Sequence, residues 1–243
     1  MKRFYRQATV DLGDQGHRVL LDGRPLRTPG RQPLVTPTAS LAQAIAAEWQ
    51  AQSETIRPAA LPLTRLASTA LDRMPALRTA AINEAAGYAG TDLLCYRAGE
   101  PLELVRRQHH AWQPLLDWAA TTCGARLCVT TSMLPIEQPR PALQRLRAVV
   151  EALPDWHLVG LHAATTALGS LVLGLALLRG RLDAERAVSV SLLDELFEIE
   201  RWGRDAETER RHAALRRDVE AAAVFLERLG ALTPAASGPP TAS

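Results

Sequence analysis

The segment that most constrains the fold is an apolar stretch from Trp156 to Leu178, WHLVGLHAATTALGSLVLGLALL. It is about as long as a membrane-spanning helix, so it must lie either in a bilayer or in the centre of a protein core. His157, His162 and Ser170 would be costly beside lipid tails, and the many small residues suit close packing of helices. We therefore expect one buried helix over 156–178 and no stable insertion into a membrane.

The first 36 residues carry strand and turn signals. Residues 4–10 alternate between polar and apolar side chains, as in a half-buried strand. Asp22-Gly23 separates two further extended runs, and an Asp-Gly pair tolerates the positive φ angles of a type I′ hairpin turn. A short strand is expected to follow at 34–36. Together these signals predict a small antiparallel β domain over residues 1–36, which is too small to bury much apolar surface alone.

From residue 37 onward the pattern becomes helical. Thr36 is the predicted N-cap before Pro37, and Leu41, Ile45 and Trp49 recur at every fourth position of the first helix. Further helices are expected at about 62–74, 75–89, 103–122, 139–153, 183–202 and 205–229. The fold class is therefore α+β, with an α-helical domain over 37–230 and, because residues 231–243 have little to bury, a disordered tail.

The composition argues against nucleic acid as a partner. Apolar residues make up 47% of the chain, which is enough to fill a core, while the net charge is only +2. No strong field would attract a polyanion, and we expect a soluble globular protein. Cys95, Cys123 and Cys128 form no C-x-x-C pair and have no His at metal-ligand spacing, so reduced thiols and no metal site are predicted.

The sequence contains no motif typical of catalysis or cofactor binding. His109 and His110 are adjacent, and adjacent helical side chains point about 100° apart, so they cannot converge on one ion. A G-x-S-x-G elbow, a phosphate-binding loop and a dinucleotide-binding fingerprint are all absent from the sequence. No catalytic, cofactor-binding or metal-binding residue is therefore predicted.

The segment LLDELFEIERWGRD, residues 192–205, carries an acidic cluster of Asp194, Glu195 and Glu198. On residue types alone, a solvated helix face is the first interpretation, contact with a partner the second, and acid–base catalysis the last. Leu192, Leu196 and Ile199 are spaced four and three residues apart, so they share the opposite side of this helix, which we assign to the core.

Four stretches of the chain resemble the family of ATP synthase assembly chaperones that bind the α subunit. They are LDGRPLRTP at 21–29, LAQAIAAEWQAQSETIRPAALPLTRLASTALD at 41–72, HAWQPLLDWAATTCGARLCVT at 110–130, and ALGSLVLGLALLRGRLDAERAVSVSLLDELFEIERWGRDAE at 167–207. Their order and spacing also agree with the family, so the resemblance extends over about residues 4–229.

The resemblance implies a small β domain joined to a larger helical domain, a protein that is not an enzyme, and no cofactor. It implies that the chaperone binds the unassembled α subunit and prevents its aggregation before pairing with β. The important acidic position of the family matches Asp194 or Glu195, and the sequence does not separate the two. Further partner-contact candidates match family motifs: Trp49, Thr64, Arg65, Trp202 and Gly203. The two tryptophans could equally hold helices together.

Two other functions stay open at this point. One is an enzyme whose carboxylates and His109 or His157 meet only in the folded chain, and the other is a membrane-associated assembly factor anchored by 156–178. The N-terminus MKRFYRQATVDL resembles neither a signal peptide nor a transit peptide. We therefore expect the bacterial cytoplasm as the compartment, whereas the resemblance places eukaryotic relatives in the mitochondrial matrix. A monomer is expected as well.

Overall fold

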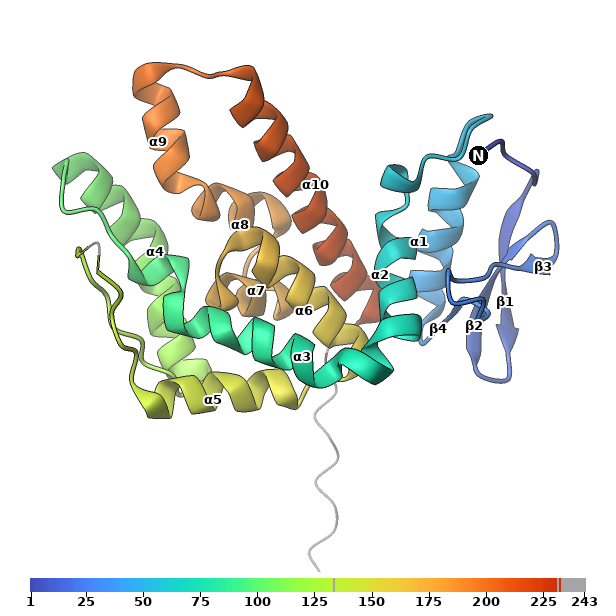
Figure 1. The fold of residues 1–243 in the computed structure, drawn as a ribbon, viewed down its shortest axis with the longest axis horizontal. Helices are drawn as coiled ribbons and strands as arrows, with labels where there is room; N and C mark the ends of the chain where they lie inside the picture. The colour runs from blue at the N-terminus through green and yellow to red at the C-terminus, as the bar shows by residue number, and fades with distance from the viewer. Residues whose placement is uncertain (133, 231, 233–243) are drawn as a thin grey trace, which may run out of the picture.

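The computed structural model describes residues 1–132, 134–230 and 232. It has the expected α+β fold, with a small antiparallel sheet at one end and helices over the rest (Figure 1). The strands are β1 (Ala8–Gly13), β2 (Gly16–Leu21), β3 (Arg24–Pro25) and β4 (Val35–Thr36). Strand β2 pairs with all three others.

The hairpin turn predicted at Asp22-Gly23 is confirmed. Both residues have positive φ angles, 47° and 77°, as a type I′ turn requires. The first strand was placed too early, because pairing with β2 begins only at Ala8. Before it, the Tyr5 side chain is buried and its hydroxyl donates to the Trp49 carbonyl oxygen at 2.7 Å, so the N-terminal segment is held by a helix.

The helices account for most of the chain and agree with the predicted order. They are α1 (Ala39–Gln50), α2 (Pro62–Ser68), α3 (Met74–Gly87), α4 (Leu102–Thr122), α5 (Arg140–Glu151), α6 (Asp155–Leu168), α7 (Leu171–Leu178), α8 (Ala184–Ser191), α9 (Leu193–Trp202) and α10 (Ala206–Leu229). A π-helical turn over Thr69–Arg73 joins α2 to α3, so the chain stays helical from 62 to 87 where two separate helices were predicted. The predicted helix over 183–202 is in turn two helices, which meet at Leu192.

The apolar segment 156–178 is buried as predicted, but it is not one helix. Gly169 adopts a left-handed conformation, with φ of 66°, and ends α6. Ser170 then begins α7, because its Oγ accepts a hydrogen bond from the Leu173 amide at 3.0 Å. In the part of the chain that the structure describes, no helix is long and apolar enough to cross a membrane.

The N-cap of α1 is Thr38 and not Thr36. Thr38 Oγ1 accepts from the Leu41 amide at 3.3 Å and donates to the Arg228 carbonyl oxygen at 2.7 Å. A single hydroxyl therefore caps α1 and fastens it to the end of α10. The Thr36 hydroxyl instead donates to the Thr38 carbonyl oxygen at 2.9 Å.

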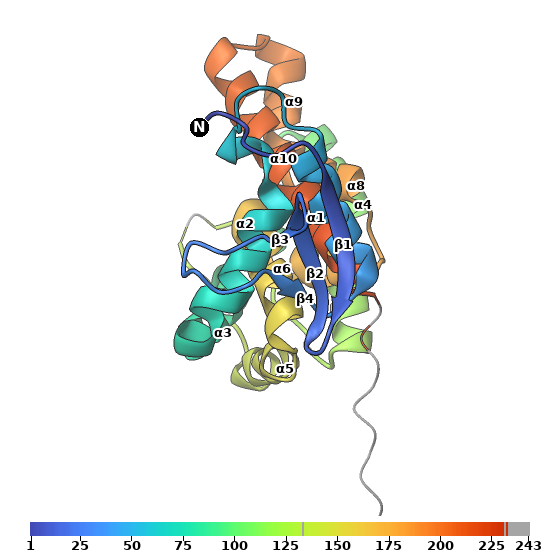
Figure 2. The same ribbon diagram turned by 90° about the vertical axis from the view of Figure 1, so that its right-hand side faces the viewer.

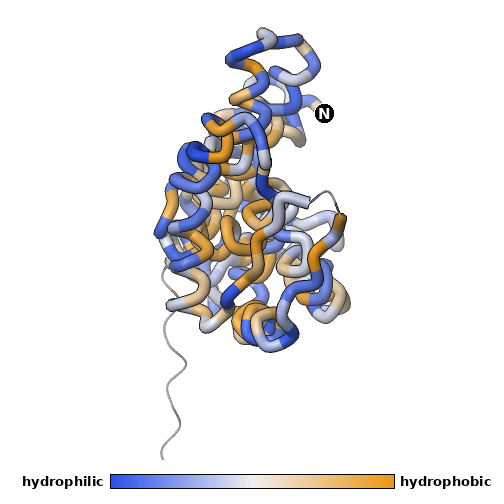
Figure 3. Tube along the Cα trace, turned by 90° about the vertical axis from the view of Figure 1, so that its left-hand side faces the viewer, coloured by the Kyte–Doolittle hydropathy of each residue, from blue (hydrophilic) through white to orange (hydrophobic). Residues whose placement is uncertain are grey.

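One continuous hydrophobic core joins the sheet to the helices. Helix α1 packs on β1 and β2, and α10 packs against α6 and α8 as well as α1 and α2 (Figures 1 and 2). Trp156 stacks on Phe225 of α10, with ring centroids 5.9 Å apart. Coloured by hydropathy, the middle of the helical region is mostly hydrophobic (Figure 3).

The division into domains stays a prediction, because nothing tests whether residues 1–36 form a separate domain. The tail predicted at 231–243 lies, apart from Leu232, outside the described residues.

A buried carboxylate organises the start of α7. Asp92 is fully buried, and its two oxygens accept hydrogen bonds from Ser170 Oγ at 2.7 Å and from the amides of Val172 at 3.0 Å and Leu94 at 3.2 Å. It thereby joins the chain before α4 to the N-terminus of α7. Burial raises the pKa of Asp92 to about 6, although these hydrogen bonds favour the ionised form.

Stability should therefore depend on the protonation of Asp92. Because its pKa is higher in the folded state than the ordinary value of about 3.9, its contribution is fully present below about pH 4 and is lost as the pH rises through about 6. The substitution D92N removes this titration. Urea unfolding of both proteins should show the stability of wild type relative to D92N falling by about 2 kcal/mol between pH 4 and pH 7. A difference that stays constant over this range would contradict the prediction.

Candidate partner-binding surface on α9 and α10

Helix α9 contacts its neighbours through an aromatic ring that lies between two arginines. The Phe197 ring is buried, and the guanidinium carbons of Arg107 and Arg201 lie 5.1 and 4.2 Å from its centroid. Of the predicted core stripe, Leu192 is buried, but Leu196 and Ile199 are only half-buried. Phe197, the buried residue of α9, is not in the apolar stripe that the sequence predicts.

Ion pairs extend this contact between α9 and α4. Arg107 pairs with Glu103 at 2.6 Å and with Glu200 at 2.7 Å, and Arg201 reaches the other oxygen of Glu103 at 3.3 Å. Each of these pairs is exposed and adds little stability alone, but together they fix the register of the two helices.

Asp194 points from α9 toward α4. Its Oδ1 accepts a hydrogen bond from Gln108 Nε2 at 2.7 Å, and the buried Gln108 in turn accepts from the Ala98 amide at 2.9 Å. Within the described residues, no arginine, lysine or histidine forms an ion pair with Asp194. Burial, followed by repulsion from Glu198 and Glu195, raises the pKa of Asp194 above its usual value. This carboxylate is half-buried without a compensating cation.

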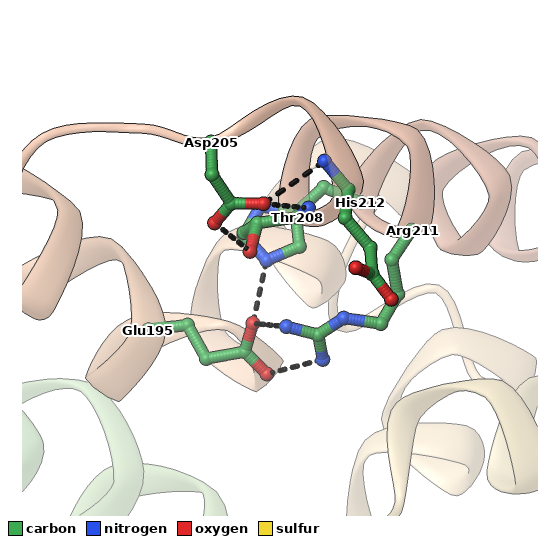
Figure 4. A network of polar contacts seen from close by, with 6 residues as sticks. Glu195, Asp205, Thr208, Arg211 and His212 are labelled. Carbon is green, nitrogen blue, oxygen red and sulfur yellow. Dashed lines mark hydrogen bonds and ion pairs between the residues drawn. The ribbon is translucent and has the colours of Figure 1, made fainter.

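Glu195 is placed differently, because it points toward α10. Its two oxygens accept hydrogen bonds from Arg211 at 2.9 and 2.6 Å, and His212 Nε2 lies 2.6 Å from one of them (Figure 4). Burial opposes ionisation, but the bonds from Arg211 and His212 outweigh it, and the pKa of Glu195 lies below its usual value. Asp205 caps the same end of α10 by accepting from the amides of Glu207 and Thr208, both at 2.9 Å.

Trp202 and Gly203 lie at the free end of α9. The Trp202 side chain is 85% exposed, which is unusual for an indole and typical of an interaction site. Gly203 ends the helix with a φ of 86°, a conformation that other residues rarely adopt. Trp202 is therefore not the internal anchor that the sequence left open.

Trp49 and Thr64 hold α1 to α2. The buried Trp49 donates from Nε1 to Thr64 Oγ1 at 3.0 Å, and Thr64 Oγ1 donates to Glu48 at 2.9 Å. Glu48 also accepts from the amides of Leu63 and Thr64, at 2.6 and 3.0 Å, and so caps α2 from α1. Of the three candidates in this region, only Arg65 is exposed, and it pairs with Asp218 of α10 at 3.1 Å.

Helix α10 contacts both groups of candidate residues, the one on α9 and the one on α1 and α2. Arg211, which binds Glu195, and Asp218, which binds Arg65, are seven residues apart, or about two helical turns. Such positions share one side of a helix and lie about 10 Å apart along its axis. The structure thus brings Glu195 and Arg65 to the same side of α10, while Trp49 and Thr64 lie beneath Arg65. No sequence pattern had identified Arg211, His212 or Asp218 as members of this surface.

The histidines named in the sequence analysis do not converge. His162 pairs with Glu84 at 2.9 Å, and His157 Nε2 lies 3.3 Å from the Gly230 carbonyl oxygen. Among the described residues, no group of three or more His, Cys, Asp or Glu side chains could hold a metal ion.

Comparison with known proteins gives a consistent result. The family model described as ATP12 chaperone protein matches residues 2–120. The crystal structure of Atp12 from Paracoccus denitrificans is 45% identical, with a TM-score of 0.89 over 94% of this chain and 98% of that one. The Atu1473 protein from Agrobacterium tumefaciens is 39% identical, also with a TM-score of 0.89, over 94% of this chain and 86% of its own. The mitochondrial protein atp12 of Schizosaccharomyces pombe is 25% identical over 218 residues, which cover 83% of this chain and 74% of that protein.

The two neighbouring carboxylates should differ in their effect on stability. E195Q removes a charge that Arg211 and His212 bind, so we expect the melting temperature at pH 7 to fall by a few degrees. D194N removes an uncompensated, half-buried charge and keeps an oxygen for Gln108, so the melting temperature should stay the same or rise. Differential scanning calorimetry of both variants checks this, and a larger loss in D194N would contradict the assignment.

Proposed function

Because this chain belongs to the ATP12 chaperone family, whose members are chaperones of ATP synthase assembly, we propose that its client is the unassembled α subunit of the catalytic head. A subunit that has not yet met its neighbours exposes surface destined for an interface, and such surface invites wrong association. A chaperone that covers this surface prevents aggregation, and the β subunit later displaces it. We propose that the chain does this as a monomer in the bacterial cytoplasm, without catalysis or a cofactor.

The observation that carries this proposal is the environment of Asp194. A half-buried carboxylate without a cation gains most from a partner that supplies one, because an arginine or lysine of the client would form a charge-assisted hydrogen bond with little further desolvation of the acid. Glu198 on the same helix is exposed and adds to the negative charge. Trp202 offers an apolar contact at the end of this helix.

The other candidates take supporting roles in the proposal. Glu195 positions α9 against α10, and Gly203 allows the sharp turn that leaves Trp202 at the helix end. Arg65 is a second exposed contact residue, whereas Trp49 and Thr64 position the helix that carries it.

The proposal predicts a specific loss of function in D194K. This substitution places a cation where the client cation binds, so suppression of α-subunit aggregation should fall at least tenfold in effective concentration, as measured by light scattering. The matched control is E220K, which reverses an exposed carboxylate in the middle of α10. Circular dichroism must show both variants folded. A folded D194K that protects the α subunit as well as wild type does would overturn the site assignment.

The client itself is tested by purification from the native cell. An affinity-tagged copy at its natural expression level should recover the ATP synthase α subunit without an equal amount of β, because the chaperone leaves when β binds. Quantitative mass spectrometry of the eluate measures the ratio. Recovery of the assembled head, or of β alone, would contradict the proposed client.

A further inference from the structure

A groove with a volume of about 810 Å³ lies where the β-strand region meets the helices. One wall is the segment 27–30 that follows β3, and the other is α2 with the π-helical turn Thr69–Arg73. In Figure 2 these segments lie beside each other, next to the sheet. The groove lies away from α9 (Figure 1), and the role proposed for Asp194 does not involve it, although the candidates Trp49, Thr64 and Arg65 are among its lining residues.

The two walls are fixed to each other by one carboxylate. Asp72, in the π-helical turn, accepts hydrogen bonds from Thr28 Oγ1 at 2.7 Å and from the Gly30 amide at 2.8 Å. A Cβ atom at Gly30 would lie only 2.6 Å from Asp72 Oδ1, so this close approach requires glycine. The groove is therefore preformed, and both oxygens of Asp72 are already engaged. Single π-helical turns of this kind are frequent at functional sites.

The lining combines an apolar surface with a positively charged edge. Trp49, Pro58 and Leu61 contribute apolar surface. The exposed side chains of Arg27, Arg65 and Arg73 surround it. Arg27 donates to a backbone carbonyl oxygen, that of Arg31, at 2.7 Å, and keeps its full charge. In the described part of the chain, Arg73 forms no ion pair, and Arg65 pairs only with the exposed Asp218.

We propose that this groove binds an extended segment of the client in which an apolar side chain is flanked by aspartate or glutamate. The apolar side chain lies against Trp49 and Leu61, and the flanking carboxylates meet Arg27 and Arg73. This inference rests on the proposed chaperone function and adds a second contact of opposite charge to the one at Asp194. The chain's own residues 233–243 contain no Asp or Glu, so they do not match the charge of the groove.

The test reverses the charge at the edge of the groove and leaves its apolar lining and Asp72 unchanged. In R27E/R73E both substituted side chains are exposed, so the fold should be kept, and we expect the Kd for purified unassembled α subunit to rise at least tenfold. R27K/R73K keeps the charge and should lose less than threefold. R126E/R140E makes the same change in net charge on exposed residues that do not line the groove, and should bind like wild type. Biolayer interferometry measures all four proteins, with circular dichroism as the control for folding.

The binding measurements distinguish the proposal about the client from the proposal about the groove. Wild type that fails to bind the α subunit overturns both the proposed client and the occupant of the groove. Wild type that binds, together with R27E/R73E that binds equally well, overturns only the groove proposal.

Photo-cross-linking identifies what occupies the groove. A benzoylphenylalanine at Thr69, which lines the groove and is partly exposed, should cross-link to one client peptide with more acidic than basic residues. Cross-links to a basic client peptide, or to this chain's own C-terminal residues, would overturn the proposal.

Discussion

The packing of α10 on α6 is the contact on which the rest of the structure depends. Gly160 lets α10 approach so closely that a Cβ at this position would lie 2.5 Å from a methyl carbon of Leu226. Residues of α10 outside this contact bind three other helices. Arg211 pairs with Glu195 of α9, and Asp218 pairs with Arg65 of α2. The Arg228 carbonyl oxygen accepts a hydrogen bond from Thr38 at the start of α1. A change that moved α10 away from α6 would therefore displace three other helices together.

The attachment of α9 differs in kind from that of α10. Phe197 is buried between two arginines and lies outside the main core, and the remaining contacts of α9 include hydrogen bonds and ion pairs from Glu195, Asp194 and Glu200. Such contacts are strongly directional but bury little apolar area, so they orient a helix more than they stabilise the fold. Glu195 is paired with Arg211 and His212 in this way, whereas Asp194 has no cationic partner among the described residues. The two adjacent carboxylates differ because Glu195 faces Arg211 and His212 of α10, whereas Asp194 faces Gln108 of α4.

The sequence predicted local structure well where one residue type decides it. The Asp22-Gly23 turn and the apolar stripe of α1 follow from local sterics and periodicity. The break at Gly169 was missed because the apolar run continues through it, and the cap at Thr38 was missed because Thr36 before Pro37 gives the same signal two residues earlier. For the site, the resemblance proposes both carboxylates as candidates, but only tertiary contacts show that Arg211 and His212, 16 and 17 residues further along, bind one of them.

The two surfaces of opposite charge lie on α9 and at the groove beside α2, and α10 contacts both helices, which has a consequence for recognition. If the client offers a cation to Asp194 and carboxylates to Arg27 and Arg73, then it can bind in only one orientation, because the reversed orientation brings like charges together at both ends. The distance between the two surfaces is set by α10, which binds Glu195 and Arg65 about two turns apart. Charge arranged in this way contributes more to orientation and association rate than to affinity. That balance suits a chaperone, since a client held in one defined orientation by individually weak contacts can be released in steps when its permanent partner arrives.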